Sequence, residues 1–208
     1  MKSYTVNEMF YSLQGEGMRA GTCNVFLRLS GCNMRCEQEA GPKSPGGFDC
    51  DTEFASGRRL TLEEVLDGVD QTWEPSKQSD RAVILTGGEP GLQADKNLVD
   101  GLRDRGYFTA IETNGSIDVS GLGIDWITVS PKVAEHAIRQ VTASEVKYVR
   151  GYGQGIPRPT CKAQHQLISP AFNGLTIDQK SLGWCVELVK ENPSWRLAAQ
   201  LHKLWSAR

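Results

Sequence analysis

The chain has 208 residues, of which 39% are hydrophobic and 23% charged, with a formal net charge of −2 and a pI near 6.0. These values predict one soluble domain that can bury a core, and they argue against nucleic acid or a membrane surface as an electrostatic partner. The opening MKSYTVNEMF has no apolar signal segment, and no apolar run reaches the length of a membrane span. We therefore expect a cytoplasmic protein whose six cysteines are thiols, metal ligands or core residues rather than disulfides.

Short segments rich in β-branched and aromatic residues predict seven strands. They are residues 24–30, 81–87, 107–113, 126–131, 145–150, 165–170 and 195–201. Three further segments, residues 60–73, 95–107 and 176–193, are predicted helices. Thr61 and Glu64 have the spacing of a capping box at the start of the first helix, whereas Gly106 and Pro193 are stop signals for the other two.

This alternation of strands and helices predicts an α/β fold with a parallel sheet. A closed eight-unit barrel needs roughly 250 residues, so we expect a partial, open barrel that occupies residues 1–208 as a single domain. In such sheets the chemistry gathers at the C-terminal ends of the strands. Those ends carry the sequences SGC, TGGEP, ETNG, SPK and ISPAFNG.

Three cysteines, Cys32, Cys36 and Cys50, follow the first predicted strand. Thiolates suit iron or zinc, and three ligands would leave the metal centre open to a further group. The alternative is a loop with incidental thiols. The remaining cysteines offer no obvious fourth ligand: Cys23 precedes the strand, Cys161 lies in a distant loop, and Cys185 lies on the apolar stripe of a predicted helix.

The segment LTGGEP, residues 85–90, ends the second predicted strand. Its two glycines would let the backbone approach a ligand, Glu89 could meet a ligand amine, and Pro90 would fix the turn. Three cysteines after the first strand, GGEP after the second and a partial α/β barrel together resemble the radical S-adenosylmethionine (SAM) enzymes. This resemblance implies a partial, modified (β/α)6 barrel and a [4Fe-4S] cluster held by the three cysteines. In that family the fourth iron binds SAM, which is cleaved to a 5′-deoxyadenosyl radical.

More of the chain is similar to one subgroup, 7-carboxy-7-deazaguanine synthase. The similar segments are NEMFYSLQGEGMRAGTCNVFLRLSGCN, CDT, LTGGEP, ETNG, SPK and the C-terminal QLHK. The resemblance implies that the chain rearranges 6-carboxy-5,6,7,8-tetrahydropterin to 7-carboxy-7-deazaguanine, with release of ammonia and with assistance from Mg²⁺. The radical would take hydrogen from C6 of the pterin, the ring would contract, and hydrogen return would regenerate SAM. The product would enter queuosine and other deazapurine pathways.

The resemblance also assigns roles to individual positions. Cys32, Cys36 and Cys50 would bind the cluster, and Thr52 would offer an oxygen to Mg²⁺. The substrate contacts would be Leu13, Gln14, Gly15, Glu16, Arg28, Thr86, His202 and, through the terminal carboxylate, Arg208. Without the resemblance, QGEG would be an ordinary turn, Thr52 a turn hydroxyl, and Arg28 a member of a surface ion pair.

The SAM contacts implied by the resemblance lie at the ends of three predicted strands. They are Gly88, Ser130, Pro131, Lys132, Ser169, Pro170, Ala171 and Phe172. The SPAF segment, residues 169–172, departs from the family's more usual QP pairing. Glu112 has two interpretations, a contact with the SAM ribose or metal region and a buried pair with a lysine or arginine.

Two segments depart from a minimal radical SAM domain. Thirteen residues, about 37–49, separate Cys36 from Cys50 where most of these enzymes have two, and we interpret them as an inserted cluster loop. Phe48 stands one place before the position at which the family has an aromatic residue against the adenine. A C-terminal tail, about residues 202–208, is expected to close the substrate site.

The resemblance implies a homodimer and an external electron donor such as flavodoxin or ferredoxin, with no nucleic acid and no membrane as partner. Two other functions compete with this one. A glycyl-radical-type activating enzyme would share the cysteines and a GGEP-like turn but would not need QGEG, the Mg²⁺ threonine or the tail. A non-enzymatic iron-sulfur or zinc module would need the thiols alone.

Overall fold

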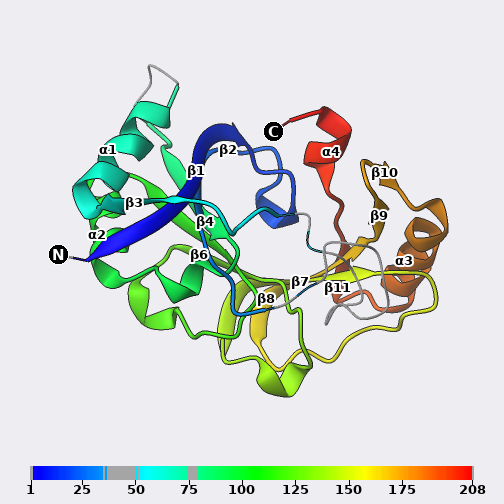
Figure 1. The fold of residues 1–208 in the computed structure, drawn as a ribbon. Coiled ribbons are helices and arrows are strands. Elements are labelled where there is room, and N and C mark those ends of the chain that lie inside the picture. Colours follow the sequence, from blue (N-terminus) through cyan, green and yellow to red (C-terminus); the bar gives the residue numbers. More distant parts are fainter. Residues whose placement is uncertain (1, 35, 37–49, 51, 75–78, 208) are drawn as a thin grey trace.

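The computed structural model describes residues 2–34, 36, 50, 52–74 and 79–207. These residues form a nine-stranded sheet in the order β11-β8-β7-β6-β5-β4-β2-β1-β3 and a separate hairpin of β9 and β10. The strands are β1 (Ser3–Leu13), β2 (Cys23–Leu29), β3 (Arg58–Thr61), β4 (Ala82–Gly87), β5 (Phe108–Thr113), β6 (Trp126–Val129), β7 (Thr142–Arg150), β8 (Lys162–Pro170), β9 (Phe172–Asn173), β10 (Thr176–Ile177) and β11 (Trp195–Leu197). The sheet is open and strongly curved, with helices on its outer side (Figure 1).

The helices are α1 (Leu62–Thr72), α2 (Lys96–Asp104), α3 (Gln179–Glu191) and the short α4 (Leu201–Trp205), and one-turn 3-10 helices lie at η1 (Gly17–Arg19), η2 (Pro90–Leu92), η3 (Ser120–Leu122) and η4 (Glu135–Ala137). No helix in the described ranges is long and apolar enough to cross a membrane. Thr61 caps α1, accepting a hydrogen bond from the Glu64 backbone while the Glu64 side chain accepts one from Thr61, so the predicted capping box is confirmed.

All seven predicted strands are present, and each pair of neighbours from β2 to β11 is parallel, as predicted. The last strand is shorter than predicted: β11 ends at Leu197, and Leu201 already begins α4. Strands β1 and β3 were not predicted; β1 pairs antiparallel with β2, and β3 pairs antiparallel with β1 at the edge of the sheet. An irregular register between Val6 and Glu8 interrupts the pairing of β1 with β2, and only part of β1 alternates between buried and exposed residues.

One face of the sheet is apolar and is covered by helices. Register places Leu27, Leu85, Ile111 and Ile127 side by side on this face. The core beneath α1 and α2 includes the first three of these side chains, and a second core beneath α3 includes Val146. Burial of these side chains, each worth about 1.5–3 kcal/mol, accounts for the choice of this face as the outer one.

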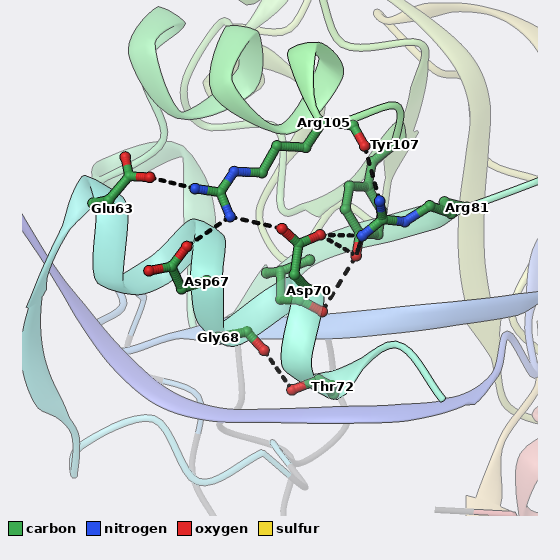
Figure 2. Close-up of polar contacts among 9 residues, drawn as sticks. Glu63, Asp67, Gly68, Asp70, Thr72, Arg81, Arg105 and Tyr107 are labelled. Carbon is green, nitrogen blue, oxygen red and sulfur yellow. Dashed lines mark hydrogen bonds and ion pairs between the residues drawn. The ribbon is translucent and has the colours of Figure 1, made fainter. Parts of the chain in front are cut away.

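A polar network joins α1 to the ends of β4 and α2 (Figure 2). Asp70 on α1 accepts hydrogen bonds from Arg81, from the Tyr107 hydroxyl at 3.0 Å and from Arg105 at 2.6 Å. Arg105 also reaches Asp67 at 2.8 Å and Glu63. Burial opposes ionisation of Asp70, but Arg105, Tyr107 and Arg81 outweigh it and lower its pKa. The network therefore fixes α1 against the sheet by ionic contacts as well as by its apolar stripe.

The opposite, inner face of the sheet carries a row of polar residues across neighbouring strands. Arg28 on β2 is in register with Thr86 on β4, and Glu112 on β5 is in register with Thr128 on β6, which faces Glu145 on β7. No long helix covers this face (Figure 1) among the described elements. A sheet whose inner face is polar near the C-terminal ends of its strands provides a place for a polar ligand.

Candidate active site

The cysteine loop begins directly after β2 and is held by the GGEP turn. The Gly31 amide donates to the Phe54 carbonyl at 2.8 Å, and the Glu89 amide donates to the Gly31 carbonyl at 2.9 Å. A Cβ on Gly88 would lie 2.1 Å from the Gly31 carbonyl oxygen and 2.9 Å from Cys32 Cβ. Gly88 is therefore required for the close approach of the two loops.

Neighbouring charges and burial raise the pKa values of two thiols of the predicted cluster site, Cys32 and Cys36. Burial raises the pKa of Cys32, and the charges of Glu89 and Cys50 raise it further. Burial and then the neighbouring Cys50 and Cys32 raise the pKa of Cys36, although Lys132 acts in the opposite direction. In the described ranges no three His, Cys, Asp or Glu side chains are close enough to hold a metal ion. Residues 37–49, the predicted inserted loop, lie outside the described residues.

Thr52, the predicted Mg²⁺ ligand, lies beside the third thiol. Its carbonyl oxygen is 3.7 Å from Cys50 Sγ, and its side chain is half-buried. A second contact ties this segment to the sheet, because the Ser30 hydroxyl donates to the Ser56 carbonyl at 2.5 Å. The segment after Cys50 therefore returns to the end of β2, which is where the first cysteine lies.

Glu89 does not have the role that the sequence suggested. Its side chain is fully buried, and its carboxylate accepts hydrogen bonds from the Thr113 hydroxyl at 2.7 Å, the Asn114 amide at 2.7 Å and the Gly91 amide at 2.8 Å. Burial raises its pKa against these hydrogen bonds. The expectation that Glu89 meets a ligand amine was wrong, because the side chain instead locks the GGEP turn to the ETNG turn.

The ETNG turn, residues 112–115, also contacts the cysteine loop. Asn114 Nδ2 donates to Asn33 Oδ1 at 3.1 Å, and Asn33 Nδ2 donates to the Ser116 hydroxyl at 2.8 Å. Three turns that were separate motifs in the sequence thus form one connected surface at the C-terminal ends of β2, β4 and β5.

Arg28 and Thr86 project from the inner face just below this surface. Arg28 Nε lies 3.0 Å from Glu8 Oε1, and the Arg28 side chain is 23% exposed. Its guanidinium group also lies over the Phe10 ring, 5.9 Å from the centroid. The ion pair expected as the alternative role of Arg28 is present. The five donors of a guanidinium group still allow it to bind a carboxylate as well.

The QGEG loop, residues 14–17, follows β1 and lies over the inner face. Leu13 is the last residue of β1 and is paired with Cys23. Gln14 Nε2 donates to Glu112 Oε1 at 3.0 Å, and Gln14 Oε1 accepts from the Glu16 amide at 3.0 Å. The loop therefore has defined side-chain positions and is anchored on β5.

Glu16 brings a negative charge to the loop and holds it between β7 and the C-terminal segment. Its carboxylate accepts from Lys147 Nζ and from Gln200 Nε2 at 3.0 Å, and His202 Nδ1 lies 4.0 Å away. Burial opposes ionisation of Glu16, but the charge and hydrogen bond of Lys147, followed by Gln200 and His202, lower its pKa to about 2. Glu16 is thus a fixed anion at neutral pH.

The C-terminal segment packs directly on this loop. The Leu201 amide donates to the Gly15 carbonyl at 2.8 Å, and a Cβ on Gly15 would lie 2.5 Å from three atoms of His202. Figure 1 shows α4 returning over the open side of the sheet, near the β9–β10 hairpin. Lys203 lies over the Phe172 ring of that hairpin, 5.2 Å from its centroid. Arg208 lies outside the described residues.

The predicted SAM contacts lie at the ends of β4, β6 and β8. Ser130 accepts a hydrogen bond from Lys132 Nζ at 3.1 Å, Pro131 lies between these two residues, and Gly88 adjoins Cys32. Ser169 is 1% exposed, and its hydroxyl has no hydrogen-bond partner among the described residues. The Ala171 amide, after Pro170, donates to the Arg150 carbonyl at 3.0 Å. A buried hydroxyl without a hydrogen-bond partner is costly, so Ser169 is suited to bind a polar ligand atom.

Two buried ionic side chains on β7 were not singled out from the sequence. Lys147 and Glu145 alternate with the outward Val146 in the segment EVKYV, which indicated a strand but not that its polar residues were buried. Glu145 accepts from the Met18 amide at 2.8 Å and from the Thr128 hydroxyl at 2.9 Å. The signal available was a lysine within a strand between apolar residues, which requires a buried anionic partner.

Glu112 forms the buried pair that was one of its two expected roles. Its Oε2 lies 3.5 Å from Lys147 Nζ. Burial raises the pKa of Glu112 to about 7, with contributions in the same direction from Glu16 and Glu145 and opposition from Lys147 and Gln14. The inner face thus holds one fixed anion, Glu16, and one carboxyl group that titrates near neutral pH.

The other cysteines lie away from this surface. Cys23 is exposed at the opposite end of β2 from Cys32. Cys185 is fully buried in the core beneath α3, as predicted, and Cys161 is buried in the same core. Burial raises the pKa of both buried thiols to about 11. They are structural side chains.

Comparison with known proteins places these features in a family. A family model described as a 4Fe-4S single cluster domain matches residues 13–117. The chain is 35% identical to 7-carboxy-7-deazaguanine synthase of Bradyrhizobium diazoefficiens, over 97% of each chain. It is 38% identical to the enzyme of the same name from Bacteroides thetaiotaomicron, over 98% of each. The crystal structure of QueE from Escherichia coli superimposes with a TM-score of 0.68 at 25% identity, over 96% of this chain and 95% of that one.

Proposed function

Because the chain belongs to the 7-carboxy-7-deazaguanine synthase family of radical SAM enzymes, we propose that it converts 6-carboxy-5,6,7,8-tetrahydropterin to 7-carboxy-7-deazaguanine and ammonia. It is an enzyme that uses a [4Fe-4S] cluster and SAM, and the family name fits queuosine biosynthesis. The observation that carries the proposal is the docking of the C-terminal segment on the QGEG loop, through the Leu201 amide and the Gly15 carbonyl. A loop held in this way over the polar inner face can bind and cover a small flat substrate.

The residues present fit the two cofactors. Cys32, Cys36 and Cys50 would hold the cluster, because thiolates are its ordinary ligands and Cys50 lies near enough to raise the pKa of both Cys32 and Cys36. The unpaired Ser169 hydroxyl and the Ser130–Lys132 pair would contact SAM, together with Gly88, Pro131 and the 170–172 segment. When bound, these cofactors supply a carbon-centred radical that removes a hydrogen atom from the substrate.

The substrate contacts follow from the donors and acceptors on the loop. A carboxylate has about four lone-pair positions, and protein groups use two of those of Glu16. The others can accept from the ring NH and amino groups of a pterin, while Gln14, Gly15 and Leu13 offer amide and backbone contacts. Arg28 would bind the substrate carboxylate, with Thr86 beside it, and His202, which lies 4.0 Å from Glu16, would be a further contact.

A divalent ion, Mg²⁺, completes the proposed site. Thr52 would supply one oxygen, and substrate oxygens and water would supply the rest, since Mg²⁺ prefers hard oxygen ligands. The terminal carboxylate of Arg208 is proposed as a further substrate contact. We also propose that the protein is a cytoplasmic homodimer and that flavodoxin or ferredoxin reduces it.

The test is an anaerobic assay of the reconstituted protein with carboxytetrahydropterin, SAM, Mg²⁺ and a reductant. We expect 7-carboxy-7-deazaguanine to form without net consumption of SAM. A cluster-loaded protein that forms no deazaguanine product would refute the proposed activity. A glycyl radical on an added partner protein would then favour the activase function. Zinc alone on metal analysis, or a cluster whose paramagnetic resonance ignores SAM, would favour a non-enzymatic module.

A further inference from the structure

Lys147 is a buried cation in the middle of the inner face. Its side chain is 7% exposed, and it extends from β7 between two carboxylates, Glu16 on the loop after β1 and Glu112 on β5. A buried ammonium group is costly unless charges and hydrogen bonds compensate it. Here the two carboxylates compensate it. Burial lowers the pKa of Lys147, but Glu112 and Glu16 together raise it well above the ordinary value.

Lys147 closes a ring of contacts that no adjacent pair of elements could form alone. Lys147 donates to Glu16, whose amide donates to Gln14, and Gln14 donates to Glu112, which lies 3.5 Å from Lys147. Gln200 attaches the C-terminal segment to the same ring through Glu16. The ring therefore connects β5, β7, the QGEG loop and the tail.

The neighbouring residue on the same face holds the other side of the loop. Glu145 accepts from the Met18 amide at 2.8 Å, and a Cβ on Gly17, which has φ +71°, would lie 2.1 Å from Glu145 Oε1. Strand β7 thus contacts this segment twice, through Lys147 at Glu16 and through Glu145 at Met18. The backbone of the loop is set by Glu145, so the specific contribution of Lys147 is to the Glu16 side chain.

We propose that Lys147 is a positioning residue for substrate binding, which orients the Glu16 carboxylate toward the pterin and couples it to Glu112 and to the tail. This inference rests on the proposed function, in which Glu16 accepts from the pterin ring. The ion pairs of Lys147 are with these two carboxylates, so we assign its effect on the substrate to the Glu16 carboxylate. It acts through Glu16.

The inference predicts a particular pH behaviour. Glu112 is faced by Lys147 and Glu145 from β7, by Glu16 and Gln14 from the loop, and by Arg19 from η1; His202 from α4 faces Glu16. Removing the Lys147 charge takes away the main influence that lowers the pKa values of Glu112 and Glu16. Both pKa values should rise, and the acid limb of the profile of kcat/KM against pH should move to higher pH.

The test compares Lys147→Met and Lys147→Arg with a matched control, Lys162→Met, at an exposed lysine on the adjacent strand β8. We expect Lys147→Met to raise KM for the pterin at least about tenfold, with a smaller change in kcat. Its acid limb should shift to higher pH, and Lys147→Arg should restore part of the loss. Cleavage of SAM without substrate should remain as in the parent protein. An unchanged KM and pH profile in folded Lys147→Met would overturn the inference.

Two further measurements keep the result decisive. If Lys147→Met does not fold, the double variant Lys147→Met with Glu112→Gln removes one charge of each sign; a raised KM for the pterin supports the inference, and a parental KM overturns it.

Hydrogen exchange of residues 14–19 and 200–206 is measured without substrate, and we expect faster exchange in both segments of Lys147→Met. Parental exchange in both segments would count against the coupling. The two proposals can fail separately. If the parent protein makes no deazaguanine product but both segments still exchange faster in Lys147→Met than in the parent, the proposed function is refuted and the coupling by Lys147 is supported.

Discussion

At the scale of single residues, the most informative side chains are those whose surroundings differ although their type is the same. Cys32 and Cys50 raise the pKa of Cys36 in the cysteine loop, whereas Cys185 is packed in the core and Cys23 is exposed at the far end of β2. One residue type therefore occupies three different environments. The proposed ligand Cys32 follows the C-terminal end of β2, whereas Cys23 lies at its N-terminal end.

The cluster assignment is tested by Cys36→Ala, with Cys23→Ala as its control. Loss of one thiolate should lower the iron bound per chain after anaerobic reconstitution and reduce SAM cleavage more than about 100-fold, because metal sites depend strongly on each ligand. Cys23→Ala should behave as the parent protein. Retention of a full cluster and of activity in Cys36→Ala would make the assignment wrong, with Cys23 as the next candidate.

At the scale of elements, the loop after β1 and the short helix α4 form one unit although they are far apart in the sequence. Gly15 is the contact point, because its carbonyl accepts from Leu201 and its missing Cβ leaves room for His202. Neither segment predicts this contact by its own sequence, since each segment is short.

Gly15→Ala should separate the two segments. The added Cβ would lie 2.5 Å from His202, so the tail must move. We expect kcat/KM for the pterin to fall about 10- to 100-fold, as misplacement of a binding group by about 1 Å can cause. Cleavage of SAM without substrate should be unaffected. Gly183→Ala on α3, where no atom lies within 4 Å of the new Cβ, is the control. Equal behaviour of the two variants would contradict the proposed contact.

The α1 network makes a prediction about stability rather than activity. Asp70→Asn leaves Arg81 and Arg105 without their shared partner and should lower the free energy of unfolding by about 1–2 kcal/mol. Asp67→Asn removes a more exposed partner of Arg105 and should change it by less than about 0.5 kcal/mol. Urea denaturation at neutral pH measures both changes.

The same network sets the sign of a pH effect. The pKa of Asp70 is lower in the folded protein than in the unfolded chain, so its contribution is present above the unfolded pKa and is lost as the pH falls. The difference between parent and Asp70→Asn should therefore shrink in acid. A difference that grows as the pH falls would show that Asp70 is not held as an anion.

At the scale of the whole molecule, the open sheet places its helices and a cluster of ionic residues on opposite faces. Helices α1, α2 and α3 cover the outer face, and the inner face carries Glu16, Glu112, Glu145 and Lys147, of which Glu145 and Lys147 are buried and the other two half-buried. Ionic side chains in such a place make stability depend on pH as well as on packing.

Glu112 makes the clearest contribution of this kind. Its pKa is raised to about 7 from the ordinary 4.5, so its stabilising contribution is complete below about 4.5 and is lost as the pH rises through 7. Between these values it should reduce the free energy of unfolding by up to about 1.4 kcal/mol per pH unit. Glu112→Gln should remove this slope in denaturation curves recorded between pH 5 and 8. The same slope in the variant would assign it to another group.

Several properties of this protein were determined by the amino-acid sequence alone. Local patterns sufficed for β2 and for the strands from β4 to β8, for the capping box at Thr61 and for the family, since each depends on residues that are close together in the chain. The motifs QGEG, CDT and GGEP likewise identified the family because they are short and contiguous.

Only the tertiary structure decided how those motifs are combined. Glu89 lies within a ligand-binding motif yet bonds the next turn, and β1 pairs antiparallel although its pattern is weak. Lys147 resembled an ordinary strand lysine until the sheet placed Glu16 and Glu112 on either side of it. Burial and charge pairing depend on residues far apart in the chain, 131 positions for Glu16 and Lys147, and no local pattern records which of them will meet.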